Sequence, residues 1–318
     1  MIPIVMICDD NYVMQTSVAI TSLMNNKNNE TVYEVNVVMA ECSSESEKIL
    51  KSMERPDCKI NIVRESLDKY SDIKQMAHVS AACLLKFDIC EIFDKYDKIL
   101  YLDGDIIVRK DLSDLYVTDL GDHYAAAVKE MYGMTEEGKK NAGNINAGIM
   151  LFNASKMRAD KMRDFLVDKR RSLGDRGSMD QQTYNMVFKG QFKYIPLKYN
   201  CVPGRLIGDA KLDYNMKALN DFYGTDYTSP EAIIEDAVII HFATGNKPWK
   251  YTFAPCAKEW YSYYTKSPFK NNKIKMYGRW GYRFHNIAKI MKSEGFGGVI
   301  NYMSHRSDRK VKKKVSWD

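Results

Sequence analysis

The chain has 318 residues, of which 45% are hydrophobic and 28% charged, a composition typical of a globular protein with a sizeable core. Seven cysteines are scattered along it without a CxxC pair, which disfavours zinc ribbons and thioredoxin-like redox sites. Because no apolar run approaches the ~20 residues of a membrane span, and the N-terminus lacks the pattern of a signal peptide, we expect a cytoplasmic protein.

The first part of the chain alternates strand and helix patterns. Apolar runs and helical spacing occur in the order strand 2–8, helix 12–26, strand 35–39, helix 43–53, strand 59–63, helix 79–93 and strand 98–102. This alternation predicts an α/β fold with a mostly parallel sheet and helices on both faces. No GxGxxG follows the first strand, so a dinucleotide-binding domain is not expected.

Beyond about residue 145 the pattern loosens into an α+β region. Strands are predicted over 146–153 and 237–240, and helices over 155–170 and 179–188. After Pro268 the composition becomes aromatic and basic. We therefore predict a single large domain over residues 1–268, followed by a basic, partly helical appendage over residues 269–318.

The net charge of +6 is unevenly distributed. Residues 270–318 contain 13 Lys or Arg and 3 Asp or Glu, a charge of +10, so the residues before them carry −4. Basic residues interleaved with aromatic rings suit peripheral contact with an anionic membrane, such as the inner face of the plasma membrane. A solvated charged end is an equally good interpretation. Because no nucleic-acid-binding motif accompanies the charge, we expect no nucleic-acid partner.

Asp103-Gly104-Asp105 directly follows the strand predicted over 98–102. Ligands bind to parallel sheets at the carboxyl ends of the strands, so polar side chains here are candidates for a site. Exposed acids in a turn are the alternative, but unpaired carboxylates at the end of a buried strand would be costly. Mg²⁺ and Mn²⁺ prefer carboxylate oxygens and complete their shells with substrate phosphates. The sequence therefore predicts that Asp103 and Asp105 bind a divalent cation.

His241 ends the strand predicted over 237–240 and is a candidate third ligand. A histidine beside a strand is more often a packed core residue, but Gly245 and Lys247 follow it here. A flexible backbone and a lysine near a cation suit a diphosphate leaving group, whose developing charge the ammonium would neutralise. Because imidazole is a poor ligand for Mg²⁺, the histidine favours Mn²⁺, with Mg²⁺ as the alternative.

Five motifs together resemble those of glycosyltransferase family 8, which includes bacterial lipooligosaccharide α-galactosyltransferases, related α-glucosyltransferases and glycogenin. In chain order they are Asp9-Asp10-Asn11-Tyr12, Asp103-Gly104-Asp105, Asn146-Ala147-Gly148, Asp180-Gln181 and His241 to Lys247-Pro248-Trp249. The resemblance covers roughly residues 2–250. It implies a GT-A fold, which is a Rossmann-like nucleotide-sugar-binding domain, with a UDP-hexose donor, Mn²⁺ and transfer that retains the anomeric configuration.

The resemblance also implies roles at the nucleotide end of the donor. Asp9 and Asn11 would hydrogen-bond the ribose and uracil, and Tyr12 would stack on the base. Asp103 would approach the ribose as well as bind the cation, whose protein ligands would be the three residues described above.

At the sugar end, Asn146 and Asp180 would contact the donor hexose, Gln181 would lie near the reacting anomeric carbon, and Lys247 would hold the diphosphate. One departure concerns Lys86, because the family usually has an arginine there that contacts the donor. Lysine keeps the charge but loses the bidentate geometry, so the affinity for the donor or the preference for its sugar would differ.

A second departure concerns the loop after His241. The family's glycine usually lies three residues after the histidine, where this chain has Thr244, and Gly245 follows. We therefore expect the loop that contacts the diphosphate to be shifted by one residue.

Retention of configuration can arise in two ways. A double displacement needs a carboxylate nucleophile on the far face of the sugar. Gln181 is a poor nucleophile, and Asp180 is better suited to holding sugar hydroxyls or capping a helix. We therefore expect front-face substitution, in which the leaving phosphate helps to deprotonate the acceptor hydroxyl.

The resulting hypothesis is a retaining hexosyltransferase that transfers galactose or glucose from a UDP-sugar to a glycan or lipid-linked glycan during synthesis of a surface polysaccharide or lipooligosaccharide. Two alternatives stay open at this point. One is a nucleotidyltransferase that makes the nucleotide-sugar, although such enzymes usually have a Gly-rich loop after the first strand. The other is a non-catalytic UDP-sugar-binding protein.

Overall fold

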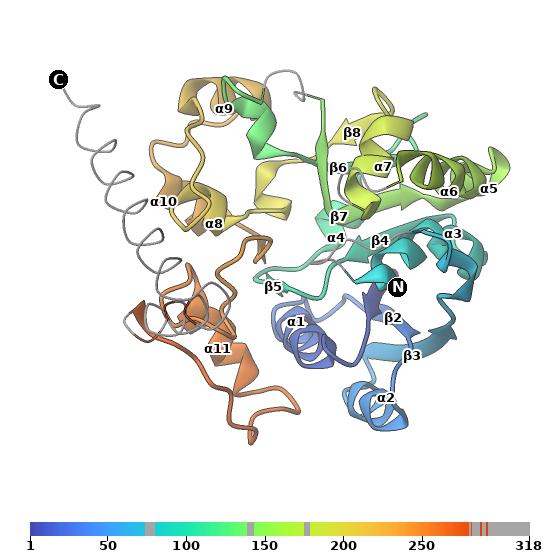
Figure 1. The fold of residues 1–318 in the computed structure, drawn as a ribbon, viewed down its shortest axis with the longest axis horizontal. Helices are drawn as coiled ribbons and strands as arrows, with labels where there is room; N and C mark the ends of the chain where they lie inside the picture. The colour runs from blue at the N-terminus through green and yellow to red at the C-terminus, as the bar shows by residue number, and fades with distance from the viewer. Residues whose placement is uncertain are drawn as a thin grey trace.

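The computed structural model describes residues 1–73, 80–138, 143–174 and 179–279, together with residues 281, 287 and 291. Within these ranges the chain forms a large sheet of strand order β3-β2-β1-β4-β7-β6-β8 and a small sheet of β5 and β9 (Figure 1). The large sheet contains β1 Ile2–Cys8, β2 Tyr33–Ala40, β3 Cys58–Glu65, β4 Lys98–Leu102, β6 Ala125–Lys129, β7 Ile145–Asn153 and β8 Phe192–Tyr194. The small sheet pairs β5 Ile106–Val108 with β9 Ile239–His241.

Helices pack around the large sheet (Figure 1). The α-helices of the described ranges are α1 Val13–Asn25, α2 Ser44–Lys51, α3 Ile89–Ile92, α4 Ser113–Tyr116, α5 Ala154–Ala159, α6 Met162–Leu173, α7 Met179–Val187, α8 Pro203–Leu206, α9 Met216–Tyr223, α10 Pro230–Asp236 and α11 Ala257–Tyr264. Short 3-10 helices are η1 Asp68–Tyr70, η2 Ala81–Phe87, η3 Met131–Met134 and η5 Leu197–Tyr199.

The large sheet separates two hydrophobic cores, as the two faces of β1 illustrate. Successive side chains of a strand point to opposite faces. Ile4 and Met6 therefore pack into the core that includes α1, whereas Val5 and Ile7 pack into the core that includes α6 and α7. Burial on both faces explains why β1 is a continuous apolar run rather than an alternating one.

The predicted α/β fold with a mostly parallel sheet is confirmed, and one strand, β7, departs from the parallel arrangement. β3, β2, β1 and β4 run parallel to their neighbours, as expected for strands joined through helices. β7 runs antiparallel to both β4 and β6. Parallel neighbours need a long crossover, usually a helix, whereas the described part of the connection from β6 to β7 contains only η3.

Two helices predicted from the sequence are interrupted. The segment 79–93, whose first residue lies outside the described ranges, forms η2 and the short α3. They meet at Asp88, whose carboxylate accepts a hydrogen bond from Tyr70 on a neighbouring segment. The predicted helix 155–170 is divided into α5 and α6 at Lys161, whose φ of 52° is left-handed and ends a helix.

The first part of the predicted appendage lies against the rest of the chain. The backbone N–H of Tyr277 donates to Lys250 at 2.7 Å, and its carbonyl accepts from Thr252 at 3.1 Å. Phe269 and Ile274 pack against the core that includes α1. Residues 269–279 are therefore folded onto the domain that precedes them.

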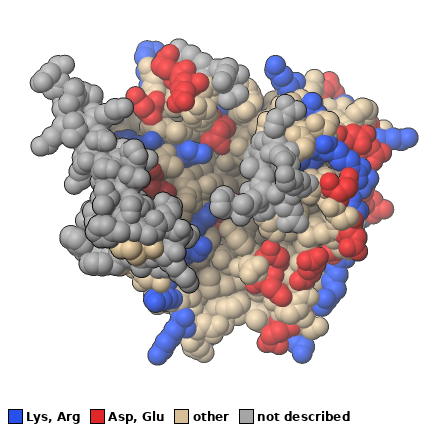
Figure 2. Space-filling view, in the orientation of Figure 1, with Lys and Arg blue, Asp and Glu red and all other residues tan. Residues whose placement is uncertain are grey.

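Residues 270–279 of the segment that suggested membrane contact are described, whereas all but three of the residues after Arg279 fall outside the described ranges. On the face shown in Figure 2, the Lys and Arg side chains of the described residues are interspersed with Asp and Glu. Among the described helices, none is both long enough and apolar enough to cross a membrane.

Candidate active site

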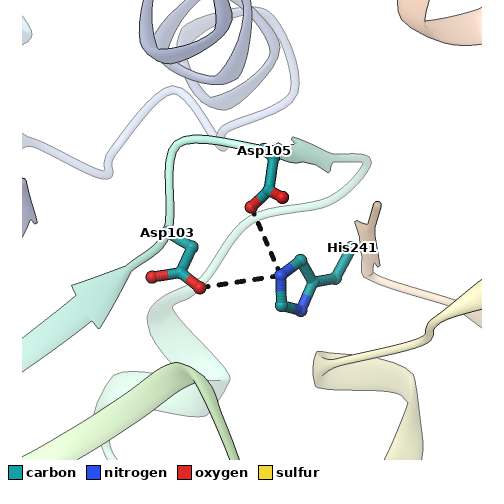
Figure 3. Close-up of side chains that lie close together, drawn as sticks. All are labelled: Asp103, Asp105 and His241. Carbon is teal, nitrogen blue, oxygen red and sulfur yellow. Dashed lines mark ion pairs between the residues drawn. The ribbon is translucent and has the colours of Figure 1, made fainter. Parts of the chain in front are cut away.

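The pairing of β5 with β9 brings Asp103, Asp105 and His241 together. Asp105 precedes β5, and His241 lies opposite Ile106 in the antiparallel register. The Nε2 atom of His241 is 3.3 Å from Oδ1 of Asp105 and 3.6 Å from Oδ2 of Asp103 (Figure 3). The potential ligand atoms of the three residues all lie within 4.8 Å of one another. Neighbouring ligands of a small octahedral cation lie about 3 Å apart, so this donor set fits a divalent ion.

Each of the three side chains has a second polar atom that is already bonded. Oδ1 of Asp103 accepts from the hydroxyl of Tyr101 at 2.7 Å. Oδ2 of Asp105 accepts from Nζ of Lys247 at 2.8 Å. Nδ1 of His241 is 2.9 Å from Oδ1 of Asn200 and belongs to a longer chain of hydrogen bonds, described below. These partners hold the three side chains and leave one atom of each facing a common point.

Gly148 on β7 lies directly against this cluster. A Cβ at position 148 would be 2.8 Å from both Oδ2 of Asp103 and Nδ1 of His241, and closer still to Cε1 of the ring. The strand is held in place because the carbonyl of Gly148 accepts from the backbone N–H of Asp103 at 2.8 Å. The position therefore has room for glycine alone.

The two carboxylates have oppositely shifted pKa values. Burial raises the pKa of Asp103 and outweighs the opposing effects of Lys86 and His241. Burial acts in the same direction on Asp105, but there Lys247 and His241 outweigh it and hold the pKa well below its ordinary value. The difference follows from contact, because Lys247 bonds directly to Asp105.

A cavity of about 320 Å³ borders the cluster. Its lining includes Lys86, Asp103, Asp105, Asn146, Asp180, Gln181, His241 and Lys247, all of which the sequence predicts for the site. Asp9, Asn11, Tyr12 and Gly245 are not part of this lining. The lining thus includes the residues expected at the metal and the sugar together with Lys247, whereas Gly245 and the residues expected at the ribose and base lie outside it.

Lys86 is buried and fully engaged. Its Nζ donates to the carbonyl of Ala147 at 2.9 Å, lies 2.5 Å from Oδ2 of Asp180, and lies 3.6 Å from Oδ1 of Asp103. Burial alone would lower the pKa of Lys86, but the two carboxylates outweigh it and raise that pKa. Lysine here connects the two acidic motifs, a task for which a point charge is sufficient.

Gln181 is tied to the strand that carries Asn146. The Oε1 atom of Gln181 accepts from the backbone N–H of Ala147 at 3.1 Å. The carbonyl of Ala147 also accepts a hydrogen bond from Nζ of Lys86. Both backbone groups of Ala147 are therefore held by side chains from outside β7. The Asp180-Gln181 and Asn146-Ala147-Gly148 motifs therefore form one rigid wall of the cavity.

The residues expected at the nucleotide lie at the start of α1. Oδ1 of Asp9 accepts from the backbone N–H of Asn11 at 3.0 Å, and its Oδ2 accepts from the hydroxyl of Ser80 at 2.9 Å. Tyr12 is half-buried and meets the Trp249 ring edge-on, with centroids 6.1 Å apart. This contact connects the first motif to the last one.

Two other motif residues have local surroundings that the sequence does not reveal. The carboxylate of Asp10 accepts from the backbone N–H and hydroxyl of Ser43, the residue that caps α2. Gly245 is exposed, and a Cβ there would approach only Asp209, at 3.4 Å. Asp10 thus holds the first motif against α2.

The sequence analysis misses Glu130, Asn200 and Arg205. Glu130 and Arg205 line the cavity, and Asn200 contacts His241. Glu130 directly follows β6, so the rule that polar residues after strands form sites would have found it if the Ala-rich β6 had been recognised. Asn200 and Arg205 follow no predicted strand and have no comparable signal.

Comparison with known proteins matches this arrangement of residues to one family. A model of glycosyl transferase family 8 matches residues 3–252. The chain belongs to this family. This membership agrees with the resemblance of its motifs.

Individual relatives agree with this assignment. Glycosyltransferase GlyA of Streptococcus pneumoniae is 30% identical over 215 residues, which are 67% of this chain and 28% of GlyA. Lipopolysaccharide 1,2-glucosyltransferase of Escherichia coli is 24% identical over 277 residues, covering 83% of this chain and 78% of that protein. The chain thus spans less than a third of the length of GlyA.

The solved structure of galactosyltransferase LgtC in complex with donor and acceptor sugar analogues superposes with a TM-score of 0.69. The match covers 84% of this chain and 96% of LgtC at 23% identity. This likeness confirms the GT-A fold predicted from the motifs.

Proposed function

We propose that this protein is a retaining hexosyltransferase that transfers galactose or glucose from a UDP-sugar to a glycan or lipid-linked glycan. The acceptor would belong to a surface polysaccharide or lipooligosaccharide. The observation that carries the proposal is the convergence of Asp103, Asp105 and His241 beside Lys247 at the edge of the cavity. A cation site next to a lysine suits a nucleoside diphosphate leaving group.

Asp103, Asp105 and His241 would hold the divalent cation, which we propose is Mn²⁺ because one ligand is an imidazole. When bound, the ion would neutralise negative charge on the diphosphate. Lys247 complements it. Its ammonium has three donors, two of which are directed to Asp105 and the carbonyl of Phe242, at 2.8 and 2.6 Å. The third can donate to a phosphate oxygen of the donor.

Front-face substitution is supported by how the two candidate nucleophiles are bonded. The carboxylate of Asp180 is paired with Lys86, and the amide oxygen of Gln181 accepts from Ala147. Gln181 would have to break its buried contact with Ala147 to attack the anomeric carbon, which is costly, and the ammonium of Lys86 neutralises the charge of Asp180 and so weakens it as a nucleophile. Asp180 would hold sugar hydroxyls with its remaining oxygen, alongside Asn146. The leaving phosphate would then take the proton of the acceptor hydroxyl.

The nucleotide would extend from the metal site toward α1. Asp9 and Asn11 would hydrogen-bond the ribose and uracil, and Tyr12 would stack on the base. The Tyr12 ring lies against the turn between β4 and β5, since a Cβ on Gly104 would be 3.6 Å from it. This proximity supports a continuous path from base to diphosphate. Gly245 would supply backbone freedom beside the diphosphate.

The decisive test is a donor screen that follows UDP release from UDP-galactose and UDP-glucose, with GDP-mannose as a control. We expect release from one of the UDP-hexoses with Mn²⁺ and weaker release with Mg²⁺. Asp105→Asn, which keeps the shape of the side chain but removes the charge, should abolish it. The α-anomeric product should be seen by NMR. If no UDP-hexose is consumed with any divalent cation and acceptor, the proposal fails.

We also propose that residues 270–318 contact an anionic membrane surface and so bring the enzyme to a lipid-linked acceptor. The charge of +10 supports this. A chain truncated after Arg279 keeps the backbone bonds of Tyr277 to the domain. It should lose binding to phosphatidylserine vesicles and keep hydrolysis of the UDP-sugar. Binding of the full chain should weaken with salt, because the Debye length is only ~8 Å at physiological ionic strength. Full-length protein that stays in solution at low salt would rule out the contact.

A further inference from the structure

A chain of hydrogen bonds runs from Glu130 to His241 through two asparagines. Nδ2 of Asn146 donates to Oε2 of Glu130 at 3.2 Å. Nδ2 of Asn200 donates to Oδ1 of Asn146 at 2.9 Å. Oδ1 of Asn200 is 2.9 Å from Nδ1 of His241. The four side chains come from the residue after β6, the start of β7, the residue after η5, and β9.

The contacts of Asn146 fix which atoms donate and which accept in this series of hydrogen bonds. A carboxylate accepts hydrogen bonds and cannot donate them, so the Asn146 NH₂ group must face Glu130. Its oxygen is fixed independently, because it also accepts from the backbone N–H of Gly148 at 3.0 Å. Asn200 must therefore direct its NH₂ group to Asn146 and its oxygen to His241. An amide oxygen only accepts, so the hydrogen bond requires a proton on Nδ1 of the imidazole.

We propose that Asn200, oriented by Asn146 and Glu130, is a positioning residue that selects the Nδ1–H tautomer of His241. In the neutral ring this leaves the lone pair on Nε2, the atom that faces Asp103 and Asp105. A ring with the proton on Nε2 would direct N–H into the metal site and could not bind a cation there. The inference rests on the proposed metal site, because it concerns how that site is prepared.

The backbone around Asn200 supports a fixed geometry. The residue that follows it, Cys201, donates its N–H to Ile239 at 3.0 Å and accepts from the N–H of His241 at 2.8 Å. Asn200 and His241 are 2% and 3% exposed, so water cannot readily replace a lost partner. Loss of the amide would remove the Asn200 partner of Nδ1 of His241 and leave Oδ1 of Asn146 with only the N–H of Gly148, at a cost typical of buried polar groups.

The test measures the tautomer first, in metal-free protein. Nitrogen-15 NMR of the imidazole rings, assigned with a His241→Asn variant, should show Nδ1 protonated and Nε2 unprotonated at a pH where the ring is neutral. Asn200→Leu, which keeps a similar volume but removes the amide, should lose this preference. Binding of Mn²⁺, measured by calorimetry, should weaken by about 10- to 100-fold in the same variant.

Three further variants separate positioning from folding. Asn200→Asp keeps an oxygen toward Nδ1 and should retain the tautomer. Glu130→Gln should also retain it, because Gly148 still fixes the oxygen of Asn146. Asn36→Leu removes an equally buried amide from β2, where Asn36 is 1% exposed, and should leave both measurements unchanged.

The proposal is overturned if metal-free wild type has its proton on Nε2, or if Asn200→Leu binds Mn²⁺ as tightly as wild type. Should Asn200→Leu fail to fold, loss of the tautomer in a folded Asn200→Asp variant would also overturn it. A wild-type protein that binds no Mn²⁺ would refute the proposed metal function. The tautomer would still decide whether Asn200 orients His241.

Discussion

Replacement of Gly148 by alanine is the smallest change that should disable the proposed metal site. The added methyl carbon would be 2.8 Å from both Oδ2 of Asp103 and Nδ1 of His241, and nearer to Cε1 of the ring. Non-bonded carbon contacts are optimal at about 3.5–4.0 Å, so the ring must move by about 1 Å. The methyl group itself cannot readily retreat, because the carbonyl of Gly148 is held by the backbone N–H of Asp103 at 2.8 Å.

The size of the effect follows from that displacement. A shift of about 1 Å in a catalytic arrangement can reduce the rate by ~10²-fold, so we expect kcat/KM to fall by at least that factor. Overpacking of a buried site costs about 1–3 kcal/mol of unfolding free energy. In a domain of this size each kcal/mol lowers Tm by roughly 2–4 °C. The variant should therefore remain folded at 25 °C while losing activity and Mn²⁺ affinity together.

Gly143→Ala is the matched control. A Cβ there would approach only the hydroxyl of Tyr194, at the ordinary distance of 3.7 Å. The assays are UDP release, Mn²⁺ calorimetry and thermal unfolding on both variants. If Gly148→Ala retains wild-type kcat/KM and Mn²⁺ affinity, the close packing of His241 against β7 does not govern the site, and the reasoning is refuted.

Three other predictions concern the metal, the nucleotide and acid stability. Asp105→Ala or His241→Ala should abolish sugar transfer, while circular dichroism should show that the variants remain folded. EDTA should inactivate the wild type, and added Mn²⁺ should restore its activity. Full activity of the wild type in excess chelator would contradict this prediction. Tyr12→Ala should weaken UDP binding at least tenfold by calorimetry, since stacking on a base is worth ~1–3 kcal/mol. Burial alone would raise the pKa of Asp111, but hydrogen bonds from Ser113 outweigh this effect and lower the pKa from 3.8 to about 2. A carboxylate whose pKa is lowered on folding stabilises the protein at pH values above its unfolded-state pKa, and this stabilisation is lost as the pH falls toward its folded-state pKa. In urea denaturation, the unfolding free energy of Asp111→Asn should therefore fall less than that of wild type between pH 4 and pH 2.

Several elements of the fold could be predicted because their signals are local. β1 to β4 are apolar runs bounded by polar turns, and each lies within a few residues of its predicted position. β5 could not be predicted. It has only three residues, Ile106–Val108, and its partner β9 lies far along the chain. The reversal of β7 also escaped prediction, because a strand's own sequence does not state which way its neighbours run.

The same distinction applies to the candidate site. Asp103, Asp105 and His241 could be proposed from the sequence, because carboxylates and a histidine directly after apolar strands have a chemistry that depends on residue type and local position. Their contact depends on the pairing of β5 with β9. The proposed orientation of the His241 ring depends further on Asn200, which has no periodic or motif relation to it in the sequence. Hydrogen bonds between distant side chains are decided by how strands pair and where loops return, and only the tertiary structure contains that information.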